Sequence, residues 1–257
     1  MSGLEVQKLS VAIDRAIIVD EVSFKASSGE VVGLIGANGV GKSTLLRGLA
    51  GILPATGEVR LDGAAVGALS LKVRARAMAY LPQGQTVHWP IDVHQLVALG
   101  RLPHLAPFSR ISAADEAAIQ AAMDKADVAE FAHREAISLS AGERARVLLA
   151  RALAVEAKVL LADEPTAALD PLHQLQVMQL LRAEAAAGGL VIVVLHDLAL
   201  AARFCDRLLL MHEGRLVADG PPTEVLTPRN LEETYQVEGY FAAHDGAPIV
   251  LPWRPTA

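Results

Sequence analysis

Short apolar runs separated by turn residues make up roughly the first 80 residues of the chain. Leu9–Ile13, Val22–Phe24 and Val31–Ile35 are rich in β-branched and other apolar residues, as strands are. Gly57–Leu61 follows the same pattern and ends at Asp62-Gly63, a dipeptide typical of turns. The pattern therefore predicts a strand-rich N-terminal part.

Helices and loops are predicted for the next stretch, from about residue 84 to about residue 158. Ser112 followed by Asp115 has the spacing of a capping box, at the start of an Ala-rich helix running towards Ala126. A second helix is predicted to follow Ser140 and to carry Ala145–Leu153. These helices form an insertion in the strand-rich chain.

Continuous apolar runs return after the insertion. Val159–Ala162 and Leu190–Leu195 show no alternation, as expected for strands that are buried on both faces of a parallel sheet. Leu172–Ala187 between them is predicted to be helical, which gives a βαβ unit. Leu208–Met211 and Arg215–Asp219 are predicted to form a hairpin. The sequence therefore predicts an α/β core with a helical insertion.

Composition narrows the class of protein. The 257 residues are 52% hydrophobic and 20% charged, which indicates a globular chain. A net charge of −6 argues against a nucleic-acid partner, since phosphate binding needs clustered basic residues. The single cysteine, Cys205, allows no intramolecular disulfide and fits a cytosolic protein. We expect no signal peptide, and the apolar runs are much shorter than the roughly 20 residues of a membrane-spanning helix.

A glycine-rich loop between a predicted strand and a predicted helix is the strongest motif. It matches the spacing of a phosphate-binding loop. Glycines allow backbone N–H groups to converge on phosphate oxygens, and the helix N-terminus adds partial positive charge. We expect Lys42 to neutralise the β- and γ-phosphates, and the Ser43 hydroxyl to reach Mg²⁺. The nucleotide-binding residues predicted here are Gly36, Ala37, Asn38, Gly39, Val40, Gly41, Lys42, Ser43 and Thr44.

Two carboxylates follow the apolar run Val159–Ala162. Carboxylates at the end of a buried strand are costly unless they meet a cation or hydrogen-bond donors. Asp163 is placed to support Mg²⁺, and Glu164 is placed to polarise the attacking water as a general base. An apolar run ending in Asp-Glu could also be a strand followed by a helix cap, so the assignment depends on the phosphate-binding loop.

Further segments complete a recognisable order along the chain. After the phosphate-binding loop come Gln83, the segment Leu139-Ser140-Ala141-Gly142-Glu143, then Asp163-Glu164, and finally His196. In this order and spacing they resemble the nucleotide-binding domains of ABC transporters, over about residues 1–230. The resemblance implies a phosphate-loop NTPase core with a mostly parallel sheet, an N-terminal antiparallel β subdomain and an inserted helical subdomain.

The resemblance also implies roles for these residues, with ATP and Mg²⁺ as cofactors. Gln83 contacts Mg²⁺ and the attacking water, and His196 contacts the γ-phosphate. Ser140 and Gly142 bind the nucleotide held by a second copy of the chain, so a homodimer is implied. Asp170 lies in the segment that organises this dimer interface and contacts between the two sites.

The resemblance implies a single nucleotide-binding domain. Residues 1–83 and 159–230 would form its catalytic core, residues 84–158 the helical subdomain, and residues 231–257 a C-terminal extension. Two positions depart from the family pattern. Ala141 stands where glycine is usual, and Ile13 stands where an aromatic residue often stacks on adenine. The first puts the affinity of the closed dimer in doubt, and the second puts base selectivity in doubt.

One segment points to a branch of the family. Gly100-Arg101-Leu102-Pro103-His104 resembles a segment of the ATPases that serve importers of iron–siderophore, haem, cobalamin and related metal chelates. Arg101 and His104 could also be ordinary loop residues. The resemblance implies an ATPase peripheral to the cytoplasmic face of the inner membrane, with a separate permease dimer and, indirectly, a substrate-binding protein. The alternatives are a soluble ABC ATPase of an assembly machinery and an inactive regulatory module.

Overall fold

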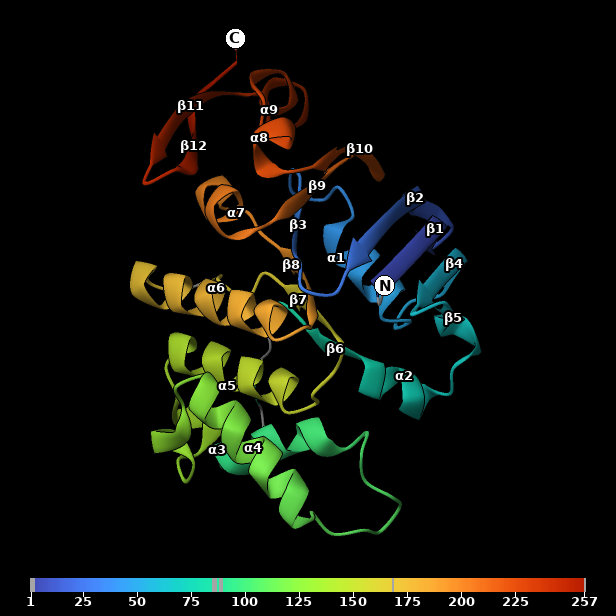
Figure 1. Ribbon diagram of the computed structural model, residues 1–257, viewed down its shortest axis with the longest axis vertical. Coiled ribbons are helices and arrows are strands. Elements are labelled where there is room, and N and C mark those ends of the chain that lie inside the picture. The colour runs from blue at the N-terminus through green and yellow to red at the C-terminus, as the bar shows by residue number, and fades with distance from the viewer. Residues whose placement is uncertain (1–2, 85–86, 88–89, 168, 257) are drawn as a thin grey trace.

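Three β-sheets and the helices around them make up the described residues of this computed structural model, which are 3–84, 87, 90–167 and 169–256 (Figure 1). The central sheet has the strand order β10-β9-β3-β8-β7-β6. Its strands are β3 (Val31–Ile35), β6 (Met78–Leu81), β7 (Val159–Asp163), β8 (Leu190–Val194), β9 (Arg207–His212) and β10 (Arg215–Gly220). All pairs are parallel except the β9–β10 hairpin at one edge. The predicted α/β class and mostly parallel sheet are confirmed.

A second sheet, of order β2-β1-β4-β5, is antiparallel throughout. Its strands are β1 (Gly3–Ile13), β2 (Ala16–Ser27), β4 (Ala55–Leu61) and β5 (Ala64–Ala65). Its apolar face packs on the same side of the central sheet as helix α1 (Lys42–Leu49), in a core cluster that includes Leu9, Leu34 and Leu46. The predicted antiparallel β subdomain is therefore confirmed.

The predicted helical insertion lies between β6 and β7 and forms a layer at one end of the molecule (Figure 1). Its helices are α3 (Val93–Ala98), α4 (Ala113–Lys125) and α5 (Ala141–Leu153), with short 3₁₀ turns η2 (Leu99–Arg101), η3 (Ala129–Phe131) and η4 (Ala136–Ser138). Ser112 caps α4 and Ser140 caps α5, each in a reciprocal capping box. Both helix starts were predicted from these serines.

Helices α6 (Pro171–Ala186) and α7 (Leu198–Phe204) complete the βαβ connections around β7, β8 and β9. Several elements were not predicted, among them the 3₁₀ turn η1 (Val66–Ala68) and helix α2 (Leu71–Ala77). None of the side chains of α2 is buried, so it has no apolar stripe for a periodicity argument to detect.

The C-terminal part was only partly anticipated. It consists of α8 (Pro222–Val225), α9 (Pro228–Tyr235) and a two-stranded sheet of β11 (Val237–His244) and β12 (Ala247–Pro255), which lies at the opposite end from α3–α5 (Figure 1). β12 packs against α7, and Tyr240 lies 5.7 Å from Trp253 between ring centroids. The sequence analysis assigned residues 231–257 only as a C-terminal extension, without predicting these elements.

The carboxyl ends of the parallel strands position the polar residues. Gly36 directly follows β3, Asp163 ends β7, and His196 follows β8 after Leu195. Because β7, β8 and β3 are neighbours in the sheet and run in the same direction, these three positions meet at one edge. The candidate site lies there.

Candidate functional site

The glycine-rich loop connects β3 to α1, as predicted. Gly36 has φ +146°, and a Cβ atom there would lie 2.4 Å from the Met211 carbonyl oxygen of β9. Only glycine fits this backbone conformation and this approach of two chain segments. The loop therefore lies against β9 at its first residue and opens into the N-terminus of α1, where N–H groups remain available for an anion.

Lys42 folds back on this loop. Its ammonium donates to the carbonyl oxygens of Gly36, at 2.7 Å, and Ala37, at 2.9 Å. An ammonium has three donors, so one remains for a ligand. Burial lowers the pKa of Lys42, and the carboxylates of Glu164 and Asp163 act in the opposite direction. The loop therefore holds one buried cation at its centre.

The Asp163 carboxylate is 1% exposed and is bound at both oxygens. Ser43 Oγ donates to Oδ1 at 2.8 Å, and the Tyr80 hydroxyl donates to Oδ2 at 3.1 Å. Arg47 Nε lies 3.3 Å from the Tyr80 oxygen. Burial raises the pKa of Tyr80, so its hydroxyl keeps its proton at neutral pH. The structure thus brings Ser43 and Asp163 together, as predicted for a metal-supporting pair.

Glu164 is the centre of a second polar cluster. Gln83 Nε2 donates to its Oε2, and His196 Nε2 contacts its Oε1. Glu164 has φ +52°, in the left-handed region that residues with a Cβ rarely adopt, and Pro165 follows it. This backbone turn aims the carboxylate away from the end of β7 towards Gln83 and His196. The three residues predicted for catalysis therefore lie in direct contact.

One pocket of about 630 Å³ is bordered both by the glycine-rich loop with Lys42 and by the Glu164 cluster. Its lining includes Lys42, Ser43, Gln83, Glu164 and His196, together with other residues of the glycine-rich loop. Its size and polarity suit a polyanion of nucleotide size. The predicted residues Gly36, Ala37, Val40 and Asp163 are not among those that line this pocket.

The apolar wall of this pocket is Ile18 of β2. Ile13, predicted at the adenine-stacking position, lies at the end of β1, is 39% exposed and is not among the lining residues. Ile18 is a side chain that the sequence did not single out. The strand pattern there shows an apolar run without indicating which member faces the loop.

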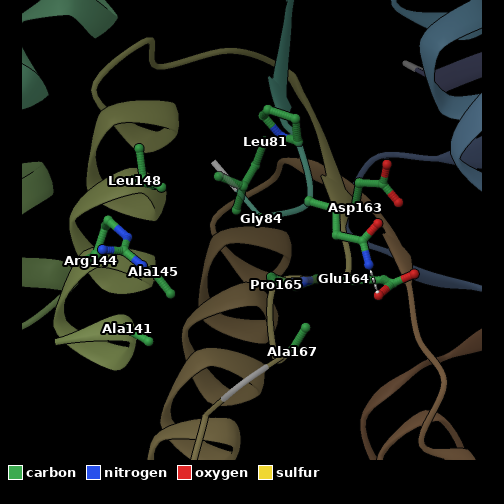
Figure 2. Close-up of a pocket in the computed structure, with 12 residues that line it drawn as sticks. Leu81, Gly84, Ala141, Arg144, Ala145, Leu148, Asp163, Glu164, Pro165 and Ala167 are labelled. Carbon is green, nitrogen blue, oxygen red and sulfur yellow. Dashed lines mark hydrogen bonds between the residues drawn. The ribbon is translucent and has the colours of Figure 1, made fainter. Parts of the chain in front are cut away.

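The start of α5 faces the Glu164 segment across a separate pocket of about 330 Å³. Figure 2 shows Ala141, Arg144 and Leu148 of α5 on one side, with Glu164 and Pro165 on the other. No α5 residue lines the 630 Å³ pocket around Lys42. Within the described part of the chain, α5 therefore does not reach the glycine-rich loop.

Neither Ser140 nor Gly142 lines the pocket that contains Lys42. The Ser140 hydroxyl accepts from Glu143 N–H at 3.3 Å, and Glu143 Oε2 accepts from Ser140 N–H at 2.7 Å. Ser140 and the departing residue Ala141 are both exposed, whereas Gly142 is half-buried. Asp170 is also exposed and caps α6, accepting from His173 N–H at 3.1 Å.

The segment Gly100–His104 turns inward. The Arg101 guanidinium is 6% exposed and donates to Asp115 Oδ1 at 3.0 Å, to Ala154 O at 2.7 Å and to Glu156 Oε2 at 2.7 Å. His104 Nε2 contacts Val155 O at 2.8 Å. These side chains tie the segment before α4 to the C-terminal end of α5. The neighbouring Leu99 and Leu102 are the exposed members of the segment.

Tyr80 is a second contributor to the site, besides Ile18, that the sequence analysis did not identify. It lies in β6, three residues before Gln83, and pairs in register with Leu161 of β7. Alternation along β6 and β7 would have placed Tyr80 and Asp163 on one face, but only once the pairing of these strands was known.

Comparisons with known proteins agree with this geometry. A model of the ABC transporter family matches residues 19–167. The hemin import ATP-binding protein HmuV of Streptomyces coelicolor is 47% identical over 240 residues, which are 92% of this chain and 85% of that protein. The cobalamin import ATP-binding protein BtuD of Halobacterium salinarum is 43% identical over 90% of this chain and 58% of its own.

A solved structure is similar over nearly the whole length. A chain from an inward-facing conformation of a metal-chelate type ABC transporter superposes with a TM-score of 0.85 and 26% identity, covering 98% of each chain. This superposition includes the C-terminal part that the sequence left largely unassigned.

Proposed function

The chain belongs to the ABC transporter family as one of its ATP-binding, ATP-hydrolysing subunits, and from this premise we propose that it energises the import of a metal chelate, with haem as the first candidate. A subunit of this kind acts on a membrane permease. The observation that supports haem as the transported substrate is the 47% identity, over 92% of the chain, to a hemin import ATP-binding protein. The cobalamin relative at 43% identity supports a corrinoid as the second candidate.

Nucleotide binding in this proposal uses the glycine-rich loop. Residues 36–44 present backbone N–H groups and the remaining Lys42 donor to the phosphates of ATP. Ile18 offers an apolar surface to the base without an aromatic ring. This arrangement binds the triphosphate through charge and the base through burial alone, so we expect weak discrimination between bases.

The site fits Mg²⁺. The Ser43 hydroxyl and the Asp163 carboxylate, 2.8 Å apart, are hard oxygen donors, and Gln83 lies at the same pocket. No group of three His, Cys, Asp or Glu side chains suited to a metal occurs in the described part of the chain. This agrees with Mg²⁺, which is usually held by one or two carboxylates, substrate phosphates and water. When bound, the ion neutralises charge on the transferring phosphoryl group.

Hydrolysis is assigned to the Glu164 cluster. Glu164 accepts a proton from the attacking water, and Gln83 and His196 hold its carboxylate in one orientation. His196 is 44% exposed at its side chain, so it can also reach the γ-phosphate of a nucleotide in the pocket. Positioning a water against a bound phosphate is the main task of such a site.

A second copy of the chain completes the proposed site. Ser140 and Gly142 stand at the exposed N-terminus of α5, outside the pocket that contains Lys42. A helix N-terminus favours an anion, so a partner's α5 can cap the γ-phosphate from the open side. Asp170 and its segment would lie at the same interface. ATP then joins two copies, and hydrolysis releases them.

The membrane partner is proposed to dock on the helical insertion. Leu99, Leu102 and Phe108 are exposed there, beside the Arg101 contacts that hold the segment in place. None of the described helices is long and apolar enough to cross a bilayer. The similarity to import ATP-binding proteins supports a peripheral subunit at the cytoplasmic face of the membrane, which receives substrate signals indirectly from a substrate-binding protein.

Purification of the tagged chain from gently solubilised membranes of its host tests the proposal. We expect a permease to co-purify, and deletion of the gene to abolish growth on haem as the iron source. A control strain carrying the Lys42→Ala variant should fail in the same way. Recovery of the chain without any permease, and unchanged growth on haem and corrinoids, would favour a soluble assembly ATPase instead.

A further inference from the structure

Both oxygens of the Asp163 carboxylate accept a hydrogen bond. Oδ1 accepts from Ser43 Oγ, and Oδ2 accepts from the Tyr80 hydroxyl. A carboxylate with a single contact can rotate about its last side-chain bond, which has a broad torsional profile. Contacts at both oxygens fix the plane of the group.

The direction of the Tyr80 hydrogen bond follows from its second neighbour. Arg47 Nε can only donate, so at 3.3 Å it uses an acceptor lone pair of the Tyr80 oxygen. The hydroxyl proton, the only one on that oxygen, is then available to Asp163 at 3.1 Å. Arg47 thereby selects the rotamer in which Tyr80 donates to the carboxylate.

Packing keeps the Tyr80 ring in place. Tyr80 and Met78 point to one face of β6, into the core cluster that contains Leu45 and Leu161, whereas Leu81 points to the other face. β6 pairs in parallel with β7, with Tyr80 opposite Leu161. The phenol therefore reaches Asp163 from a neighbouring strand, and its aromatic body is anchored independently of its hydroxyl.

We propose that Tyr80 is a positioning residue, which turns the Asp163 carboxylate so that Oδ1 and Ser43 Oγ are preset to receive a divalent cation. The inference rests on the proposed nucleotide site and adds a residue to it. Tyr80 itself does not line the 630 Å³ pocket, so it acts through Asp163. A side chain that merely satisfied a buried charge would affect stability, but not the metal dependence of nucleotide binding.

The test is Mg²⁺-dependent binding of ADP, which avoids turnover. Calorimetric titration of the full-length chain with ADP, in EDTA and over a series of free Mg²⁺ concentrations, separates the two contributions. In Tyr80→Phe, the ADP affinity in EDTA stays within about twofold of wild type, while the half-saturating Mg²⁺ concentration rises roughly tenfold, the scale of one hydrogen bond to a charged group. Turnover lost at low Mg²⁺ returns at high Mg²⁺.

Two further variants make the test specific. Tyr240→Phe removes the same hydroxyl from the exposed C-terminal hairpin and leaves both affinities unchanged. Arg47→Met keeps the Tyr80 hydroxyl but removes the Nε–H donor that directs it, and raises the Mg²⁺ requirement by a smaller factor, about threefold. Should Tyr80→Phe not fold, as judged by its melting curve, the Arg47→Met result decides.

Three results would overturn the inference. One is an unchanged Mg²⁺ requirement in a folded Tyr80→Phe protein, and the second is an unchanged requirement in Arg47→Met. The third is an equal loss of ADP affinity with and without Mg²⁺, which would assign Tyr80 to support of the phosphate-binding loop. Absence of ADP binding by the wild-type chain is a distinct outcome, since it removes the proposed nucleotide site itself.

Discussion

Two helix starts carry the predicted nucleotide contacts, and the chain builds them differently. At the start of α1, Lys42 and Ser43 are already bound to partners inside one pocket. At the start of α5, Ser140 is exposed and its side chain bonds within its own capping box. The first region is organised in part by a contact from a distant strand, whereas the second is organised by its own local sequence. Under the proposed function, a single chain therefore holds one prepared half of a site and one free half.

The difference explains what a second copy would contribute. The α1 region has cation and metal-supporting groups in place, so we expect it to bind nucleotide alone. The α5 region offers the backbone N–H groups of a helix N-terminus, and such groups gain energy when an anion arrives. We expect mutations in the two regions to separate binding from closure.

The largest expected effect sharpens this separation. Glu164→Gln keeps the shape of the side chain but removes the base, so turnover falls by about a thousandfold, within the range for a general base. ATP-bound dimers persist, because both helix starts are intact. Phosphate release and size-exclusion chromatography measure the two quantities. Glu232→Gln, on the exposed side of α9, serves as the matched control. Normal turnover in Glu164→Gln would refute the assignment.

A second prediction concerns Arg101, which donates to the Ala154 carbonyl oxygen at the C-terminal end of α5. Arg101→Met leaves Asp115 without its buried cation and costs about 3 kcal/mol of unfolding free energy. Arg134→Met removes the exposed pairing with Glu143 and costs less than about 1 kcal/mol. Urea unfolding of both variants tests the contrast. ADP binding, which uses the α1 region, stays unchanged in each; a loss of ADP binding in Arg101→Met would show that the two regions are coupled.

The third prediction concerns a substitution that disrupts only the start of α5. Ser140→Arg blocks the exposed helix start, and turnover falls about a hundredfold, the scale of losing one preorganised donor, while ADP still binds. Ser109→Arg, in the exposed loop before α4, has no effect. Mixing Ser140→Arg with Lys42→Ala chains should restore part of the turnover, since one site of the mixed dimer combines two intact halves. No restoration would argue against sites shared between copies.

A pH prediction concerns Asp115 in the capping box of α4. Hydrogen bonds from Ser112, together with Arg101, lower the pKa of Asp115 from 3.8 to about 2. A depressed carboxyl pKa stabilises the fold fully above pH 3.8, and this contribution is lost as the pH falls through about 2. The stability difference between wild type and Asp115→Asn should therefore be constant near neutral pH and shrink below pH 3.8. A difference that grew on acidification would contradict this.

The smallest expected effect concerns Ala141. Its methyl group lies at the exposed start of α5, where a partner's phosphate would approach. Ala141→Gly should tighten the ATP-dependent dimer by about threefold, the scale of a single methyl group. Analytical ultracentrifugation of the Glu164→Gln background gives the dimer constant. Ala145→Gly, one turn further along α5, should not tighten it.

Local signals predicted much of this molecule. The glycine-rich loop, the caps at Ser112 and Ser140, and the carboxylates after β7 are defined by residues close in sequence, so motif spacing was sufficient. The contribution of Tyr80 depends on which strands are neighbours, and the inward turn of Arg101 depends on Ala154, far along the chain. Helix α2 lacks a buried face and gave no periodic signal.

The glycines of the phosphate-binding loop also differ in how freely they can vary. At Gly36 both the backbone conformation and the Met211 carbonyl exclude any side chain, whereas at Gly39, with φ +80°, nothing lies within 4 Å of a Cβ. Position 39 can therefore accept asparagine at modest cost to the fold, while position 36 has a single acceptable residue. Within one motif, mutational tolerance is concentrated at the solvent side of the loop and vanishes where the loop meets β9.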